Sequence, residues 1–188
     1  MLYLIVIVLG AVLGMLAKGR ISNILDLKIE KLWLLLIAVF VQIAIRGLVL
    51  KGLVDAADYS LITQGISFSL LLIVLWYNKR LLGVLVIGLG SLANMLVMML
   101  NGGLMPISGQ LLKEYETFSW GMEFLNNGSD GRHILINEGT KLAILSDIIK
   151  MPPFLGWLMP IVSIGDLIIA VGIFLLVFLT VKGSKVKR

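Results

Sequence analysis

Ser163-Ile164-Gly165-Asp166 opens an apolar run, Leu167 to Val181, which ends in the basic tail Lys182 to Arg188. A serine three residues before an acidic residue, ahead of an apolar run, is typical of a capping box. A helix that starts here is about 27 Å long, enough to cross most of a bilayer's hydrocarbon core of about 30 Å. The sequence therefore predicts a membrane-spanning helix with Asp166 near one membrane face.

The composition indicates an integral membrane protein. Hydrophobic residues make up 59% of the chain and charged residues only 14%, and the mean hydropathy is +1.04. Too little polar surface is present to cover an ordinary soluble domain. A chain of 188 residues then predicts one all-α transmembrane domain over residues 1–188.

Five apolar segments predict a bundle of five transmembrane helices with a long outer loop that contains short interfacial helices. The predicted spans are residues 2–17, 32–50, 61–77, 81–100 and 163–181, and the outer segment is residues 101–157. Ten of the sixteen Lys and Arg residues lie on the side of the basic tail. The positive-inside rule then predicts a multi-pass protein of the cell (inner) membrane with its N-terminus outside and its C-terminus in the cytoplasm.

The charge and the metal-binding residue types limit the expected partners. The formal net charge is +5, but most cations lie at predicted cytoplasmic helix ends, so no nucleic acid is expected. Membrane lipids are the expected partners, together with a possible membrane-protein partner. The chain has no cysteine, and His133 is its only histidine. We therefore expect no metal site and no cofactor.

Polar side chains in and near the spans predict a ligand pocket that opens outward. The candidate ligand-binding residues are Arg46, Gln42, Gln64, Asn94, Asn101 and His133. Gln42 and Arg46 are four residues apart and share one helix face. Polar groups are costly in a membrane and usually face the bundle interior. The alternative is that Arg46 snorkels to the interface and the amides join helices.

Two aspartates are candidate catalytic residues. Asp166, at a helix N-terminus, is expected to stay ionised, whereas the apolar neighbours of Asp147 should make Asp147 easier to protonate. Carboxyl groups in different surroundings can divide acid and base roles. If Asp147 and Asp166 converge, they could activate water for hydrolysis. The alternative is that Asp166 only caps its helix and Asp147 only turns the chain.

Three motifs resemble those of an uncharacterised family of small multi-spanning bacterial membrane proteins, a domain of unknown function. They are Asn101-Gly-Gly-Leu-Met-Pro106, Leu145-Ser-Asp147-Ile-Ile149 and Ser163-Ile-Gly-Asp166. The resemblance covers most of the chain and implies no known activity.

A second resemblance, over a shorter part of the chain, is to type II (lipoprotein) signal peptidases, whose two aspartates lie at the outer membrane interface. Ser163-Ile-Gly-Asp166 is similar to their Asn-x-Ala-Asp motif, and Asp147-Ile-Ile149 is similar to the stretch at their other aspartate. The resemblance implies an aspartate-dependent membrane hydrolase or peptidase. The chain departs from that family in its number of spans and in having a serine where the asparagine belongs, and it lacks the Gly-Asn-x-x-Asp-Arg element.

Three functions follow from these observations. The first is binding of a lipid or small amphiphile at an outward-facing polar site at the membrane interface. The second is hydrolysis by Asp147 and Asp166. The third is an accessory or scaffold role in a membrane complex, in which the intramembrane polar residues contact a partner.

The predicted topology can be tested with single cysteines at Ser129 and Ser184, because the chain has none of its own. We expect an impermeant thiol reagent to label Ser129→Cys in intact cells, and to label Ser184→Cys only after the membrane is permeabilised. The opposite pattern would reverse the orientation.

Overall fold

The structure is a computed structural model, which describes residues 2–114, 132–152 and 161–183. Its five long helices are α1 (Leu2–Leu16), α2 (Trp33–Leu50), α3 (Ala56–Tyr77), α4 (Leu82–Leu100) and α8 (Ile164–Lys182). Four of them are long and apolar enough to cross a membrane, and α1 is a shorter apolar helix. The predicted all-α membrane fold is therefore confirmed, although α3 begins five residues before the predicted start of its span.

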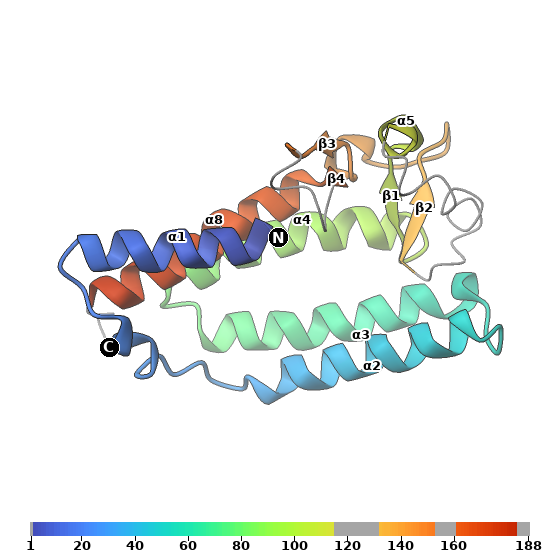
Figure 1. Cartoon of the computed structure of the whole chain (residues 1–188). Helices are drawn as coiled ribbons and strands as arrows, with labels where there is room; N and C mark the ends of the chain where they lie inside the picture. Colours follow the sequence, from blue (N-terminus) through green and yellow to red (C-terminus); the bar gives the residue numbers. More distant parts are fainter. Residues whose placement is uncertain (1, 115–131, 153–160, 184–188) are drawn as a thin grey trace.

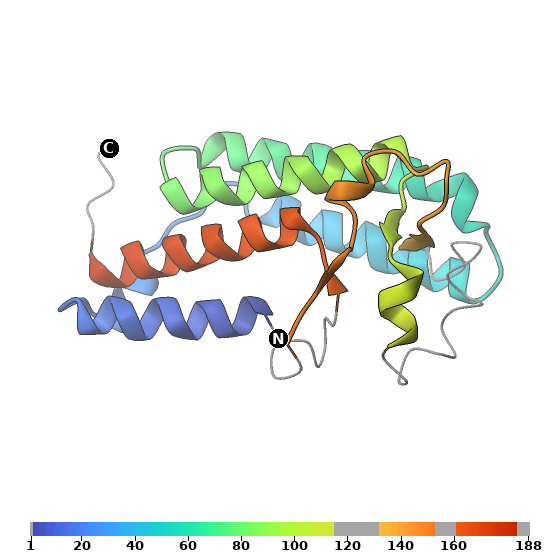
Figure 2. The same ribbon diagram turned by 90° about the horizontal axis from the view of Figure 1, so that it is seen from above.

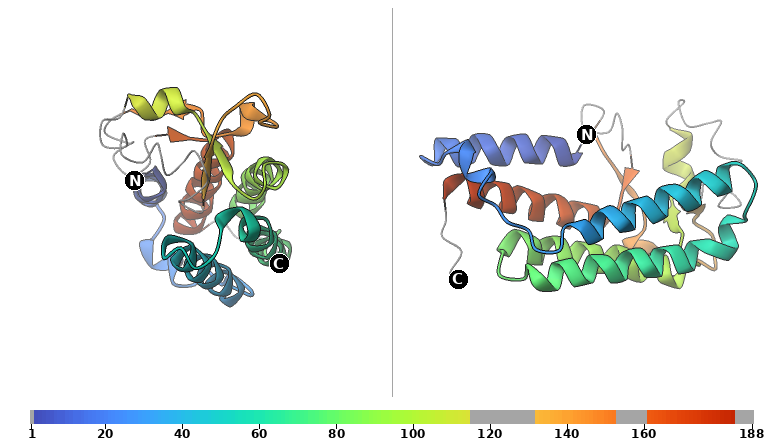
Figure 3. Two further views of the ribbon diagram at one scale, coloured as in Figure 1. Left: turned by 90° about the vertical axis from the view of Figure 1, so that its right-hand side faces the viewer. Right: turned by 90° about the horizontal axis from the view of Figure 1, so that it is seen from below.

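Helix α8 lies at the centre of the packing. It contacts α4 and α1 extensively, while α2 packs on α3 and α3 packs on α4. Figures 1 and 2 show α1 and α8 side by side, with α4 next to α8. Figures 1 and 3 show the α2–α3 hairpin as a second layer against the layer of α1, α8 and α4. We call the end of the bundle at which α8 begins the site end.

Glycines let the backbones of α4 and α8 approach closely. A Cβ atom built at Gly90 would lie 2.5 Å from the carbonyl oxygen of Gly165, and one at Gly172 would lie 2.6 Å from the backbone nitrogen of Ile87. Neither neighbour can move aside, because each belongs to a helix backbone. Small residues at such a crossing are how membrane helices gain van der Waals contact without a hydrophobic driving force.

Two glycines of α1 have the same function at its contact with α8. Gly10 and Gly14 are both buried in α1. A Cβ at Gly10 would lie 3.0 Å from the carbonyl oxygen of Phe174, and one at Gly14 would lie 2.7 Å from Cβ of Val181. These glycines therefore seat α1 against α8.

The part of the chain between α4 and α8 contains short strands that the sequence did not predict. They are β1 (Met105–Ile107), parallel to β2 (His133–Leu135), and β3 (Ile149–Lys150), antiparallel to β4 (Ile161–Val162). The same part of the chain contains the short helix α5 (Gly109–Lys113). Residues 115–131 and 153–160, where further short interfacial helices were predicted, lie outside the described part. These pairings join segments far apart in sequence, which local patterns do not reveal.

The Asn101-Gly-Gly turn joins the segment around Lys141 to the end of α4. Gly102 and Gly103 have φ of 73° and 83°, a region that favours glycine. The Asn101 amide donates from Nδ2 to the carbonyl oxygen of Lys141 at 2.9 Å, and its Oδ1 accepts from the Lys141 backbone N–H at 3.0 Å. The side chain of Asn101 therefore pairs like a backbone peptide group.

At the opposite end of the bundle another asparagine side chain pairs with a backbone peptide group. Asn78, in the basic turn after α3, is buried. Its Nδ2 donates to the carbonyl oxygen of Glu30, and its Oδ1 accepts from the Glu30 backbone N–H, both at 2.9 Å. The connection between α1 and α2 is thus held to the α3–α4 turn.

The α4–α8 crossing can be tested with two matched alanine substitutions. Gly90→Ala places its methyl group on the α8 backbone and should destabilise the fold by roughly 1–3 kcal/mol. Gly47→Ala adds the same methyl group on α2, where nothing lies within 4 Å, and should stabilise its helix by roughly 0.5–1 kcal/mol. Thermal unfolding in detergent measures both, and equal melting temperatures would show that the crossing is not tight.

Candidate functional site

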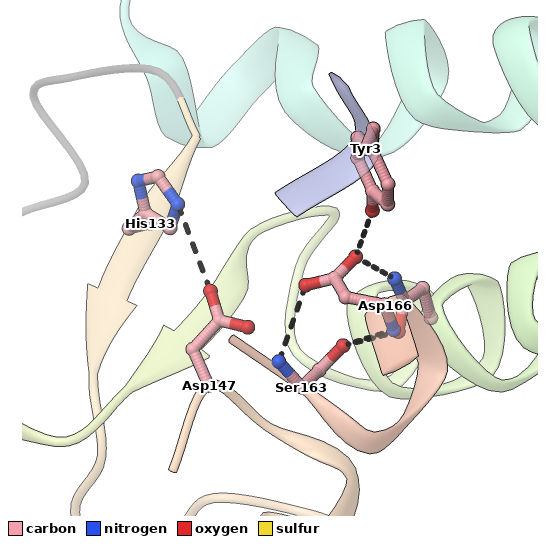
Figure 4. Close-up of polar contacts among 6 residues, drawn as sticks. Tyr3, His133, Asp147, Ser163 and Asp166 are labelled. Carbon is pink, nitrogen blue, oxygen red and sulfur yellow. Dashed lines mark hydrogen bonds and ion pairs between the residues drawn. The ribbon is translucent and has the colours of Figure 1, made fainter. Parts of the chain in front are cut away.

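The candidate site lies at the site end, where α8 begins (Figure 4). Its side chains come from five separate parts of the chain. They are Tyr3 of α1, Asn94 of α4, His133 of β2, Asp147 just before β3, and Ser163 and Asp166 at the start of α8.

The predicted capping box is confirmed. The Ser163 Oγ accepts from the backbone N–H of Asp166 at 3.0 Å, and the Asp166 Oδ2 accepts from the backbone N–H of Ser163 at 3.1 Å. Two of the otherwise unpaired amide groups at the α8 N-terminus are thereby satisfied.

Asp166 does more than cap its helix. Its Oδ1 accepts a hydrogen bond from the Tyr3 hydroxyl at 2.9 Å and another from the Asn94 Nδ2 at 3.0 Å. The Ser163 hydroxyl in turn donates to the Asn94 Oδ1 at 2.9 Å. Each of these partners of the Asp166 carboxyl group is a donor, an arrangement that suits a carboxylate, which is an acceptor at both oxygens.

The contact between α8 and Asn94 explains why a glycine, Gly165, precedes Asp166 in the motif. A Cβ atom at this position would overlap the amide of Asn94. The absence of a side chain therefore gives Asn94 room to reach both Ser163 and Asp166 from the neighbouring helix.

Tyr3 is the site residue that the sequence analysis missed. It is the one residue in α1 with a polar side chain, and this could have marked it as a candidate site residue. Its partner Asp166 is 163 positions away in sequence, so no local pattern could join the two.

Asp147 lies in different surroundings. Only 6% of the residue is exposed, and its backbone is fixed beside β1 through bonds to Pro106 and Ser108. Its Oδ2 lies 3.9 Å from the Nε2 of His133. Its Oδ1 is buried and has no hydrogen-bond partner among the described residues.

Burial raises the pKa of the Asp147 carboxyl group to about 7, and the nearby charge of Asp166 acts in the same direction. His133 acts against both by lowering this pKa. In Figure 4 Asp147 lies between His133 and the Ser163–Asp166 pair, and its second oxygen is directed toward the Asp166 side. The charge of Asp166 therefore acts on the Asp147 carboxyl group, and Asp147 changes its charge near neutral pH.

The predicted ligand-binding residues fall into three places. Asn94 is hydrogen-bonded to Asp166, and His133 lies near Asp147. Asn101 is hydrogen-bonded to the backbone of Lys141. Gln42, Arg46 and Gln64 line a separate cavity of about 210 Å³ between α2 and α3. In the described part of the chain no group of three His, Cys, Asp or Glu residues could hold a metal ion.

Comparison with known proteins shows the family of the chain. The profile of a family of unknown function, DUF5317, matches residues 26–178. The chain belongs to this family. An uncharacterised protein of Thermotoga maritima is 25% identical over 166 residues, which cover 88% of this chain and 84% of that protein. No solved structure matches. The predicted membership of an uncharacterised membrane-protein family is confirmed, and the matched residues include Asn94, Asp147 and Asp166.

The titration of Asp147 should be visible in the stability of the protein. The pKa is about 7 in the folded chain and about 3.9 for an exposed aspartate. Between these values the folded state binds more protons than the unfolded state, so stability falls as the pH rises from about 4 to about 7. At about 1.4 kcal/mol per pKa unit the loss amounts to a few kcal/mol.

Asp147→Asn removes this loss, so we expect its melting temperature relative to the wild type to increase from pH 5 to pH 8. Glu138→Gln, an exposed residue of the same segment, is the matched control and should show no such trend. A constant difference between Asp147→Asn and the wild type would mean that Asp147 does not titrate in this range.

Proposed function

We propose that this chain is a membrane hydrolase whose outward-facing site receives a lipid or other amphiphile and acts on it with Asp147 and Asp166. Two observations support this most strongly. The Oδ1 of Asp147 is buried and has no hydrogen-bond partner among the described residues, and the carboxyl group of Asp166, whose charge acts on Asp147, is held in position by three donors. A purely structural aspartate would have both oxygens paired, since an unpaired buried acceptor costs about 1–3 kcal/mol.

The two carboxyl groups divide the chemistry. A water molecule between them donates a proton to the Asp166 carboxylate while its oxygen bonds to the carbonyl carbon of an ester or amide. Protonated Asp147 gives its proton to the leaving oxygen or nitrogen as the bond to that carbon breaks. Transfer of the proton from Asp166 to Asp147 restores the starting state, so one water is consumed for each bond cleaved. A pKa near the working pH suits the Asp147 step.

The resemblance to type II signal peptidases supports the same chemistry, because their two aspartates lie at a comparable membrane depth. The present chain reaches Asp166 with an asparagine from another helix, Asn94, where that family has an asparagine in the motif itself. The site thus carries an asparagine amide beside the aspartate, although Ser163 occupies the motif position.

Binding of a lipid or small amphiphile without chemistry is the second candidate. The polar cavity lined by Gln42, Arg46 and Gln64 supports this function, because it can receive a polar group independently of the carboxyl pair.

Oxygen-18 water distinguishes the two functions for any ester or amide substrate. Purified protein is incubated with a bacterial membrane extract in H₂¹⁸O, and lipids and peptides are compared by mass spectrometry. A hydrolase should generate a product carrying one ¹⁸O atom. Asp147→Asn should reduce its formation at least about a hundredfold, because general acid–base groups typically contribute 10²–10⁴-fold.

The control is Glu138→Gln, which should leave product formation unchanged. Tyr3→Phe removes one donor to Asp166, and its activity should fall with a shifted pH profile, because Tyr3 positions Asp166. Equal ¹⁸O products from the wild type and from folded Asp147→Asn would eliminate the hydrolase. An unmodified amphiphile that remains bound without any labelled product would favour binding.

A further inference from the structure

We propose that the cavity between α2 and α3 binds the anionic phosphate group of an amphiphile, with Arg46 as its main ligand and Arg132 beside it. The proposal rests on the proposed function only in taking the ligand from the membrane, and binding itself needs neither Asp147 nor Asp166.

The cavity has the charge and polarity of an oxyanion site. It is lined by Arg46 and Arg132 and by the polar side chains of Gln42, Thr63 and Gln64, and no carboxylate among the described residues contributes to its wall. Thr63 and Gln64 are each only 8% exposed.

Arg46 has donor capacity that the protein leaves unused. Its Nε is buried and has no hydrogen-bond partner in the described part of the chain. A guanidinium group presents five N–H donors in a fixed fork that matches the geometry of phosphate. An Arg that only snorkels keeps its charged head in water, whereas Arg46 has a buried Nε and lines a cavity.

The apolar part of the cavity wall indicates that the anion carries hydrocarbon chains. Val39, Ile43 and Val49 line the cavity on the α2 side. Val39 is 53% exposed and Ile43 is 66% exposed, and both lie in a helix long and apolar enough to cross a membrane. A lipid can therefore place its phosphate at Arg46 while its acyl chains lie along α2.

The position of Arg132 connects this cavity to the carboxyl pair. Arg132 immediately precedes β2, and the first residue of β2 is His133, which lies beside Asp147. Neighbouring residues of an extended strand point to opposite sides. A single short segment thus contributes one residue to the cavity and the next residue to the carboxyl site.

Native mass spectrometry of the full chain released from nanodiscs tests the proposal. The probes are dioleoylphosphatidylglycerol, dioleoylglycerol with the same acyl chains and no phosphate, and inorganic phosphate. We expect the wild type to retain phosphatidylglycerol at least about tenfold more than Arg46→Gln does, since a hydrogen bond to a charged group contributes about 1.5–3 kcal/mol and about 1.4 kcal/mol is tenfold. Dioleoylglycerol should not be retained.

Lys51→Gln is the matched control, because it removes an exposed cation directly after the same helix. It should retain phosphatidylglycerol like the wild type, and so should Asp147→Asn, which separates this proposal from the hydrolase. Arg46→Lys keeps the charge but not the fork and should bind with intermediate affinity. Circular dichroism establishes that each variant is folded.

Three results would overturn the proposal. They are equal retention by folded Arg46→Gln and the wild type, equal retention of dioleoylglycerol and phosphatidylglycerol, and a loss in Lys51→Gln as large as that in Arg46→Gln. Displacement of phosphatidylglycerol by millimolar inorganic phosphate from the wild type would support the anion site and identify a soluble phosphate as a competing source of the ligand.

Discussion

The close approach of α8 to α4 is the constraint on which the candidate site depends. Gly90 lies against Gly165, and this contact brings the start of α8 within reach of Asn94. Asn94 can then bond to Ser163 and Asp166 together. A larger crossing distance would leave the α8 N-terminus with its own capping box but without an interhelical partner. The geometry of the site is thus a consequence of helix packing.

Side-chain amides hold the connections at both ends of the bundle. Asn101 pairs with the backbone of Lys141, and Asn78 pairs with the backbone of Glu30. Each asparagine supplies one donor and one acceptor, as a neighbouring strand would. Near a membrane, peptide groups without partners are costly, so these pairs allow irregular segments to pack against helix ends. Asn101 thereby helps to position the segment of residues 132–152, which contains Asp147.

Hydropathy predicted the helices well, because each span must satisfy its own backbone and expose apolar side chains to lipid. The capping box and the burial of Asp147 could also be predicted from the sequence, since both depend on residues that are close together in the chain. The contact of Tyr3 with Asp166 and the pairing of β1 with β2 could not be predicted from the sequence, because they join residues far apart in the chain. The same limit applied to Asn101, whose partner Lys141 lies in a different segment.

The carboxyl groups of Asp147 and Asp166 differ in their hydrogen-bond partners. Asp166 sits where a helix N-terminus, a tyrosine and an asparagine all offer donors. Asp147 receives no such donor at its Oδ1 from the described residues and is shielded from solvent. The charge of Asp166 then adds to the effect of burial, so the better held carboxylate raises the pKa of its neighbour. Asp147, which exchanges a proton near neutral pH, is therefore coupled to Asp166, since removing the donors around Asp166 alters the electric field at Asp147.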